Sequence, residues 1–360
     1  MSRQPTTDTR QPGTLPLVSV LIPARNEEAF IERCLTDIMS GDYPHDRLEV
    51  LVLDGGSTDG TVAVVERVAQ ASGWGNVRVV DNPGKTQARA MTLGIGMAAG
   101  EFICRIDAHC AYPADYITKL AGYLLQYPDV YNVAGLLKVK PSGNSAPAVA
   151  IATAYAHRFA TGNACQRVGV SRPTYVDTVG LGLYRRETFE RFGLFDTDLL
   201  RAEDQEMNCR IIKGGGKVLC VPDVSFDYYA RATYGLFARM FYQYGLFKPL
   251  AARKMGKPIT LRHFAPFAAL VLAITCLASA AVLGSPRPLA LLAALVCAYL
   301  ALSLVSACDA VRRKGQSVWL IPGACAAFWT AHSCFALGNV VGLTRFVLLR
   351  RRFADIGVSR

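Results

Sequence analysis

The chain has 360 residues, of which 51% are hydrophobic and 19% are charged, and its formal net charge is +11 at pH 7. Its mean hydropathy of +0.23 is too apolar for an ordinary soluble protein of this length, so we expect a globular domain joined to membrane segments. No RNP, helix-turn-helix or zinc-finger pattern accompanies the positive charge, which argues against a nucleic-acid partner. The 11 cysteines include no CxxC pair and fall mostly in apolar patterns, as reduced cysteines on a cytoplasmic face do.

Residues 48–61, LEVLVLDGGSTDGT, predict a strand, a glycine turn and the start of a helix. The apolar run is nearly continuous, which favours a parallel strand covered on both faces. It ends at Asp54, so a carboxylate stands at the carboxyl edge of the strand, where open α/β sheets bind their ligands. A simple cap and turn is the alternative interpretation, since short glycine-rich matches are weak evidence.

Strands and helices alternate through the first half of the chain. Further strands are predicted at residues 17–23, 77–80 and 101–107, and a helical pattern follows each of them. This spacing predicts βαβ units and a parallel sheet. The next hundred residues are less regular, with strands predicted at 130–140, 175–184 and 217–221 and helices at 147–159 and 203–213.

The last third of the chain has the composition of a membrane region. Residues 233–254 are aromatic, basic and amphipathic, which predicts a helix in the membrane interface. Three later segments are each long enough to span a bilayer, which takes about 20 residues. We therefore divide the chain into a disordered tail at 1–16, an α/β domain at 17–231, an interfacial helix at 232–262 and a membrane region at 263–349, with helices at about 264–283, 288–308 and 318–343.

The third apolar segment leaves two alternatives open. Its interruptions are Pro322, His332, Gly338 and Asn339. If the basic residues at 253–262 and 312–314 are cytoplasmic, two spans satisfy the positive-inside rule, whereas a third full crossing would place the arginines at 350–352 outside. A segment that bends back into the interface agrees better with the rule than a full crossing does.

Polar and acidic clusters follow several of the predicted elements, and parallel strands would bring the first three to one sheet edge. These clusters are Pro23-Ala24-Arg25-Asn26-Glu27, Asp54, Asp107-Ala108-His109 and Glu203-Asp204. Supporting motifs are Tyr184-Arg185-Arg186, Gly193-Leu194-Phe195-Asp196 and Gln243-Tyr244-Gly245-Leu246-Phe247-Lys248. Over residues 17–248 the chain resembles the family 2 glycosyltransferases, and within them most the glucosyltransferase type of succinoglycan biosynthesis. The resemblance implies a GT-A fold, a Rossmann-like α/β domain with a mostly parallel mixed sheet, followed by C-terminal transmembrane helices.

The resemblance also implies a role for each cluster. The residues that would line the nucleoside pocket are Pro23, Ala24, Asn26 and Glu27, and Asp54 would hydrogen-bond the base, expected to be uracil. Asp107 would hold a divalent metal, Mg²⁺ or Mn²⁺, across the diphosphate, where it neutralises charge on the leaving group. His109 stands where the family usually has a second acid, so it is either a metal ligand or a hydrogen-bonded pocket residue.

Asp204 is the expected catalytic base, which takes a proton from the acceptor hydroxyl in an inverting reaction. Lys85 and Arg105 are assigned to the donor, although each also fits a structural basic residue. The residues assigned to the acceptor or diphosphate side are Glu203, Arg210 and Gln243. Residues 243–247 lack the Arg and Trp of the Gln-x-x-Arg-Trp motif of processive synthases, so we expect transfer of a single sugar.

The resemblance therefore predicts a membrane-anchored, metal-dependent enzyme with its catalytic domain on the cytoplasmic side of a bacterial inner membrane, crossed more than once. Its expected donor is a UDP-sugar, UDP-glucose first, and its acceptor a polyprenyl-diphosphate-linked oligosaccharide in exopolysaccharide biosynthesis. Membrane lipids and other polysaccharide-assembly proteins are the further partners. Two alternatives stay open: direct transfer to polyprenyl phosphate, and a non-catalytic scaffold that binds sugar nucleotides. His109 and Thr92, where the family usually has an acid and Asn, leave room for the scaffold.

Overall fold

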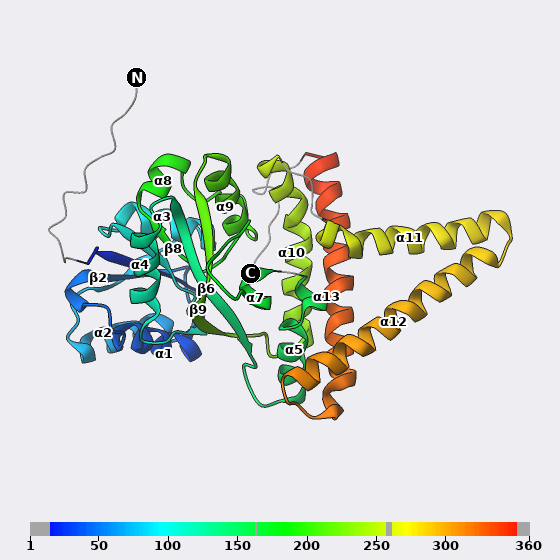
Figure 1. Cartoon of the computed structure of the whole chain (residues 1–360), viewed down its shortest axis with the longest axis horizontal. Coiled ribbons are helices and arrows are strands. Elements are labelled where there is room, and N and C mark those ends of the chain that lie inside the picture. The colour runs from blue at the N-terminus through cyan, green and yellow to red at the C-terminus, as the bar shows by residue number, and fades with distance from the viewer. Residues whose placement is uncertain (1–14, 163, 257–260, 351–360) are drawn as a thin grey trace, which may run out of the picture.

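The computed structural model describes residues 15–162, 164–256 and 261–350. Residues 1–14, most of the predicted tail, lie outside the described residues. An α/β domain holds the N-terminal part of the chain, and long helices stand at one side of it (Figure 1).

Within the described residues, nine strands form one mixed sheet in the order β3-β2-β1-β4-β8-β6-β9-β5, with β7 beside β9. Strands β1 to β4 run parallel to one another, β8 runs antiparallel to both β4 and β6, and β9 is parallel to β6. The strands are β1 (Val18–Ala24), β2 (Leu48–Asp54), β3 (Val77–Asp81), β4 (Phe102–Arg105), β5 (Cys110–Ala111), β6 (Val130–Lys140), β7 (Thr174–Tyr175), β8 (Leu183–Arg185) and β9 (Lys217–Tyr229).

Helices cover both faces of the sheet. On one face α1 and α4 pack in a core that holds Val50 and Val52 of β2. On the other face α3 and α9 pack in a core that holds Leu51 and Leu53. The helices of this domain are α1 (Glu28–Met39), α2 (Thr61–Ser72), α3 (Gln87–Met97), α4 (Tyr116–Gln126), α5 (Ala146–Tyr155), α6 (Arg158–Thr161), α7 (Cys165–Val168), α8 (Glu187–Phe192) and α9 (Glu203–Lys213).

Two of the predicted strands differ from the structure. The single strand predicted at 175–184 is wrong, because β7 and β8 are two short strands with a loop between them. In that loop Leu181 has a left-handed φ of 52°, which ends regular pairing. The strand predicted at 217–221 continues to Tyr229, since a register irregularity opposite Gly135 lets β9 pass the Pro222-Asp223 step and pair again.

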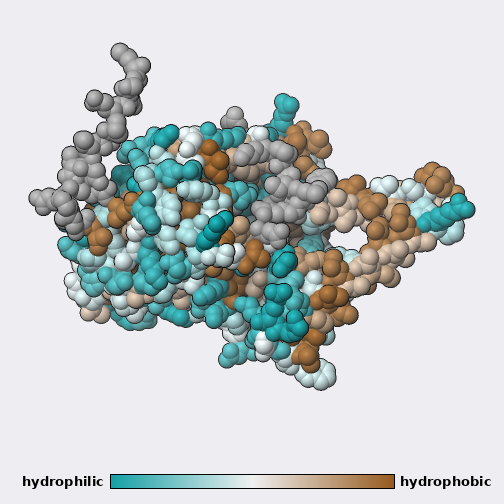
Figure 2. Space-filling view, in the orientation of Figure 1, coloured by the Kyte–Doolittle hydropathy of each residue, from teal (hydrophilic) through white to brown (hydrophobic). Residues whose placement is uncertain are grey.

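Three helices that follow α10 (Tyr234–Met255) are long and apolar enough to cross a membrane, by length and composition. They are α11 (Leu261–Leu283), α12 (Arg287–Arg313) and α13 (Ile321–Gly342), the last flanked by short helical turns at Val318–Leu320 and Leu343–Leu348. The hairpin of α11 and α12 projects away from the α/β domain (Figure 1), and its surface is mostly apolar (Figure 2). Exposed side chains such as Ile274 (57%), Leu291 (53%) and Val305 (65%) form this surface, which suits lipid better than water.

Helix α13 stands beside α10 along the edge of the α/β domain (Figure 1). It is continuous through His332 and Gly338, and Pro322 lies in its first turn, where a missing amide does no harm. The two helices meet backbone to backbone: a Cβ atom built on Gly245 would collide with the Phe335 carbonyl oxygen. Small residues permit such close approach between helices. The apolar face of α10 is thus buried largely against α13.

We expect Gly245→Ala to lower the stability of the full chain by about 3 kcal/mol, because the added methyl group overpacks a backbone contact. Gly235→Ala is the matched control, since it lies on the same helix with no heavy atom within 4 Å of the added carbon. Thermal unfolding in detergent measures both. Equal unfolding temperatures for the two variants would contradict the close contact of α10 with α13.

Candidate active site

The carboxyl ends of β1, β2 and β4 lie along one edge of the sheet. Ala24 pairs with Asp54 between β1 and β2, and Leu21 pairs with Arg105 between β1 and β4. Asp107 follows Arg105 by two residues and so reaches the same edge. Because neighbouring strands are about 4.8 Å apart, the backbones of Asp54 and Asp107 are separated by about 10 Å, with the end of β1 between them. The structure thus brings the first three predicted clusters together.

Hydrogen bonds tie the loop after β1 to the turn after β2. Asn26 has a left-handed φ of 56°. Its backbone N–H donates to Ser57 Oγ over 2.9 Å, and its side-chain Oδ1 accepts from Thr58 N over 2.8 Å. The Asp54 carboxylate is 8% exposed and accepts from Ser57 Oγ over 2.5 Å and from Gly56 N over 3.1 Å. Asp54 therefore caps its own turn here, and its contact with a base stays a prediction.

Lys85 lies over the same turn. A Cβ atom built on Gly56, whose φ is 73°, would lie 3.5 Å from Lys85 Cε and 3.9 Å from Lys85 Nζ. Pro23 and Ala24 end β1 beside this turn, and the Ala24 carbonyl accepts from Gly55 N over 2.8 Å. The exposed Lys85 side chain thus lies at the sheet edge, next to the turn after β2.

His109 is a hydrogen-bonded residue of this edge. Its Nδ1 lies 3.3 Å from Glu27 Oε1, and its ring meets Tyr228 edge-on with 5.5 Å between the ring centroids. Asp107 Oδ1 accepts from Gln87 Nε2 over 2.8 Å. In the described part of the chain, no group of three or more His, Cys, Asp or Glu could hold a metal ion. An ion here would need oxygen ligands from a substrate and water, as Mg²⁺ commonly takes them.

Arg105 points into the protein towards α9. It is 5% exposed, and its Nη2 lies 3.1 Å from Glu203 Oε1. Burial by itself would lower the pKa of Arg105, but Glu203, Asp107 and Asp204 raise it more strongly, so the guanidinium stays cationic. Its Nε and Nη1 are buried without a partner among the residues the structure describes. This position makes Arg105 a support for α9, whereas the sequence assigned it to the donor.

Glu203 begins α9 after an unusual backbone. Ala202 at the helix N-cap has a left-handed φ of 66°, which a non-glycine residue adopts only at a cost. Glu203 is 4% exposed, and this burial raises its pKa; Arg105 opposes the shift and Asp204 adds to it. A buried ion pair of this kind is costly to desolvate and depends on close geometry.

Asp204 lies at the same sheet edge as Asp107. A Cβ atom built on Gly180 would lie 2.9 Å from Asp204 Oδ2, so the carboxylate rests against this glycine. The Arg105 amide donates to the Gly182 carbonyl over 3.0 Å across the antiparallel pair of β4 and β8. Because these strands are antiparallel, moving two residues back from Gly182 to Gly180 leads to the same edge as moving two residues on from Arg105 to Asp107. The acidic residues from distant parts of the chain form one row.

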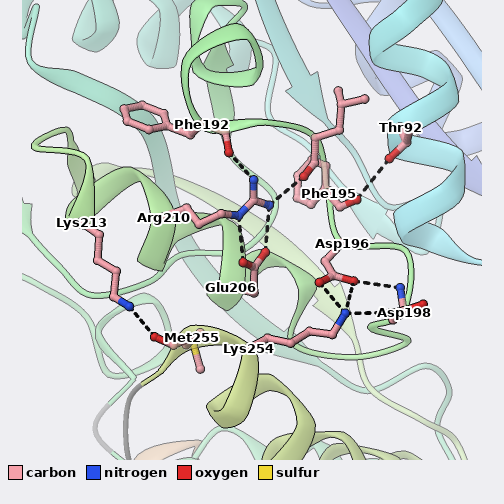
Figure 3. Close-up of polar contacts among 11 residues, drawn as sticks. Thr92, Phe192, Phe195, Asp196, Asp198, Glu206, Arg210, Lys213, Lys254 and Met255 are labelled. Carbon is pink, nitrogen blue, oxygen red and sulfur yellow. Dashed lines mark hydrogen bonds and ion pairs between the residues drawn. The ribbon is translucent and has the colours of Figure 1, made fainter. Parts of the chain in front are cut away.

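Arg210 has structural partners. It makes a bidentate contact with Glu206, with both N–O distances at 2.8 Å. Its remaining donors bind the carbonyl oxygens of Phe192 and of Leu194, the second over 2.7 Å (Figure 3). These contacts fasten α9 to the end of α8. The sequence assigned Arg210 to the acceptor or diphosphate side, but in the structure its guanidinium group is occupied by these internal contacts.

The loop after α8 is also fastened to α10 and α3. Lys254 Nζ lies 2.7 Å from both oxygens of Asp196 and 2.8 Å from Asp198 (Figure 3). Thr92 Oγ1 donates to the Phe195 carbonyl over 3.4 Å. The Gly-Leu-Phe-Asp motif thus joins the α/β domain to the helix that leads to the apolar region.

Gln243 of α10 supports a basic residue next to α9. Its Oε1 accepts from Arg201 Nε over 3.2 Å and from Arg201 Nη2 over 3.0 Å, and Gln243 is 5% exposed. The Arg201 guanidinium also stacks on Tyr244, 5.3 Å from the ring centroid. Gln243 is therefore buried against Arg201, which directly precedes Ala202 at the N-cap of α9.

Sequence reasoning missed Gln87, Gly180 and Arg201. The Gly-Leu-Gly sequence at 180–182 carried a signal, because two close glycines in an apolar run mark a close approach. Gln87 and Arg201 carried none, since only the tertiary fold places them beside Asp107 and α9.

Comparisons with known proteins agree with this arrangement. The family model "Glycosyl transferase family 2" matches residues 19–193. A dolichyl N-acetyl-alpha-D-glucosaminyl phosphate 3-beta-D-2,3-diacetamido-2,3-dideoxy-beta-D-glucuronosyltransferase of Methanococcus voltae is 30% identical over 243 residues, which cover 66% of this chain and 74% of that protein. The succinoglycan biosynthesis protein ExoA of Rhizobium meliloti is 29% identical over 227 residues, 62% of this chain and 66% of that one.

A solved structure extends the likeness to nearly the whole chain. The mannosyltransferase PcManGT from Pyrobaculum calidifontis, in complex with GDP-Man and Mn²⁺, matches with a TM-score of 0.63 and 25% identity over 95% of this chain and 91% of that one. The chain belongs to glycosyltransferase family 2. It is an enzyme, a glycosyltransferase with the GT-A fold, which confirms the predicted family and fold class.

We expect Gly180→Ala to lower kcat by about 100-fold, since a displacement of about 1 Å at a reacting group has such an effect. The added methyl group would lie 2.9 Å from Asp204 Oδ2 and must displace it. The dissociation constant for the nucleotide should stay unchanged. Gly143→Ala is the control, because no heavy atom lies within 4 Å of the added carbon. If Gly180→Ala has the same kcat as this control, the contact between Gly180 and Asp204 has no effect on the reaction.

Arg105→Met should lower stability by about 3 to 5 kcal/mol, because it leaves the buried Glu203 carboxylate without its partner. The double variant Arg105→Met/Glu203→Met should lose less than the sum of the two single variants. The control is Arg67→Met, which breaks a salt bridge at the surface: the Arg67 side chain is 57% exposed and that of its partner Glu32 is 55% exposed. Loss of this exposed pair should lower stability by at most about 1 kcal/mol. Thermal unfolding measures all four, and additive losses at Arg105 and Glu203 would refute the coupling.

Proposed function

We propose that this glycosyltransferase moves one sugar from a nucleoside-diphosphate donor to a lipid-linked acceptor, with inversion at the anomeric carbon and Asp204 as the base. The observation that supports it is the row of Asp54, Asp107 and Asp204 along one sheet edge. Such an edge accommodates a base at one end, the diphosphate near the middle and the acceptor at the α9 end.

In the proposed reaction, a carboxylate oxygen of Asp204 takes the proton of the acceptor hydroxyl. The acceptor oxygen forms its bond to the anomeric carbon as the bond from that carbon to the diphosphate oxygen breaks on the opposite face. The diphosphate leaves with the electron pair. Arg105 and Glu203 act as positioning residues that hold the first turn of α9, while Lys85 binds negative charge on the donor.

The donor nucleotide stays a proposal, with UDP-glucose as the first candidate. Asn26 and Glu27 fix the loop that would meet the nucleoside, together with Pro23, Ala24 and Asp54. The structural relative was solved with GDP-Man, so guanosine donors belong in the same assay. A panel of UDP- and GDP-sugars with a lipid extract, scored for labelled lipid product, would identify the donor.

The residues at the edge fit a divalent ion together with the donor. The carboxylate of Asp107 and the imidazole of His109 are the side chains that would hold it, and oxygen ligands favour Mg²⁺ or Mn²⁺. When bound, such an ion would neutralise negative charge on the leaving diphosphate. Gln87, which donates to Asp107 Oδ1 over 2.8 Å, would orient that carboxylate.

A lipid acceptor is supported by the chain's own architecture. Lys254 joins the α/β domain to α10, and α10 packs on α13, so the domain and the apolar helices form one body. In the proposed arrangement the hairpin of α11 and α12 enters a bacterial inner membrane, α10 and α13 lie at its cytoplasmic surface, and the α/β domain is cytoplasmic. The Methanococcus voltae relative is named for a dolichyl sugar phosphate acceptor, and the Rhizobium meliloti relative for succinoglycan biosynthesis. We therefore propose a polyprenyl-diphosphate-linked oligosaccharide, in exopolysaccharide assembly, as the acceptor.

Asp204→Asn should abolish sugar transfer while the nucleotide dissociation constant stays unchanged, because the amide cannot take a proton from a hydroxyl acceptor. Asp46→Asn, at an 80% exposed side chain on the domain surface, serves as the control. Binding of labelled nucleotide and formation of labelled lipid are the two measurements. If Asp204→Asn keeps its activity, the acceptor is an already ionised phosphate, as in direct transfer to polyprenyl phosphate.

A further inference from the structure

Two arginines near the α9 end of the site have tyrosine and amide partners. Arg167 of α7 donates from Nη2 to Tyr155 OH over 2.7 Å and lies 4.2 Å from the centroid of that ring. Arg201 donates to Gln243 and stacks on Tyr244, 5.3 Å from the centroid. Among the described residues, no carboxylate is recorded in a salt bridge with either guanidinium. Most other buried or half-buried arginines here bind Glu residues or carbonyl oxygens.

The tyrosines of these two arginines form one cluster. Arg167 also lies 5.9 Å from the Tyr228 centroid, and the rings of Tyr155 and Tyr244 both meet Phe241 edge-on, each with 5.9 Å between the centroids. Burial is the main reason that the pKa of Tyr155 is raised, so its hydroxyl is neutral and leaves the arginine charge uncompensated. We call Arg167, Arg201 and these three tyrosines the arginine–tyrosine cluster.

The cluster lies between the reacting groups and the apolar helices. On one side, Tyr228 meets the ring of His109 at the sheet edge, and the charge of Arg201 acts on Glu203. On the other side, Tyr244 belongs to α10, which packs against α13, and Tyr155 ends α5, which also packs against α13. A ligand held at the cluster would therefore reach the base from the membrane side.

Arg167 has spare hydrogen-bonding capacity. Its Nη1 is buried and has no partner within the described part of the chain. An unpaired buried donor on a cation is costly, so a stable complex is expected to supply an acceptor for it. Guanidinium groups bind phosphate oxygens in pairs with good geometry, and they do so more strongly when water is excluded.

We propose that Arg167 and Arg201 bind the phosphate of the acceptor's lipid carrier, a step that rests on the proposed function. The donor occupies the opposite end of the row, where Lys85 lies over the turn after Asp54. A phosphate ester at the cluster would point its hydrocarbon chain towards α10 and α13 and its sugar towards Asp204. The cluster thus selects acceptors by their anionic carrier, independently of the sugar that they present.

The test is a binding titration of the full chain in nanodiscs of neutral lipid, so it requires no turnover. The probe is undecaprenyl phosphate added to the disc, and separate arms use phosphatidylglycerol at equal charge and inorganic phosphate in solution. Arg167→Gln and Arg201→Gln should each weaken the binding of undecaprenyl phosphate about tenfold or more, since each removes charge-assisted hydrogen bonds. Their dissociation constants for UDP should stay within about twofold of wild type.

Arg191→Gln is the matched control. Arg191 also donates to a tyrosine hydroxyl, Tyr131 OH over 2.6 Å, and stacks 5.4 Å from that ring, but it lies on α8 away from the row. The Arg191→Gln variant should lose the same kind of arginine–tyrosine contact and still bind undecaprenyl phosphate as wild type does. Arg167→Lys and the thermal unfolding temperature of each variant detect simple misfolding. If the Arg167 variants fail to fold, Arg201→Gln alone must still weaken the binding of undecaprenyl phosphate.

Several outcomes overturn the proposal. Equal binding of phosphatidylglycerol would show a general anionic-lipid surface, and equal occupancy by inorganic phosphate would show a free-phosphate site. Loss of UDP affinity in both variants would assign the arginines to the donor. If Asp204→Asn abolishes transfer to lipid while Arg167→Gln and Arg201→Gln keep the wild-type KM for the lipid acceptor, the proposed function stands and the cluster proposal falls. If wild type binds undecaprenyl phosphate through both arginines but forms no lipid product from any donor, the proposed function falls instead.

Discussion

The buried ion pair of Arg105 with Glu203 is the interaction on which the rest of the site depends. It joins β4 to the first turn of α9, two elements separated by 98 positions in the chain. Removing two charges from water costs several kcal/mol per ion unless the geometry is good, so the fold must hold this turn closely. The left-handed Ala202 is part of that arrangement. Asp204 follows directly in the chain, and its place at the sheet edge is therefore fixed by the ion pair of its neighbour Glu203.

Close backbone contacts at glycines extend this constraint from the site to the apolar helices. Gly180 leaves room for the Asp204 carboxylate, and Gly245 leaves room for the α13 backbone. Between them, Gln243 holds Arg201 beside α9, and Lys254 holds the loop after α8 (Figure 3). Helix α10 thus contacts the site and the apolar region within one length of helix.

The sequence predicted those features that depend on local periodicity. The apolar run at 48–54 predicted a strand covered on both faces, and the structure buries Val52 in one core and Leu53 in the other. It failed at 175–184, where the apolar alternation is broken by contacts from elsewhere, because Gly180 faces Asp204 and Gly182 faces Asn132. The place of Asp54 and Asp107 at one edge was predictable, since parallel strands share an edge, whereas the approach of Asp204 of α9 to that edge was not. The partners of individual arginines were not, because a charge in the sequence carries no information about the group that will face it.

Two kinds of buried arginine show why that distinction matters for function. Arg105 and Arg210 find carboxylates within the protein, at 3.1 Å and 2.8 Å, and their charges are compensated when the chain folds. Arg167 and Arg201 instead donate to a tyrosine hydroxyl and to an amide and stack on tyrosine rings, and neither forms a salt bridge with a carboxylate among the described residues. The cation–π contacts offset part of the desolvation cost of these two arginines, but no salt bridge adds to them in the described part of the chain. In the proposed complex the compensating anion comes from outside, and the α5, α10 and α13 side of the cluster is the side from which a lipid phosphate would enter.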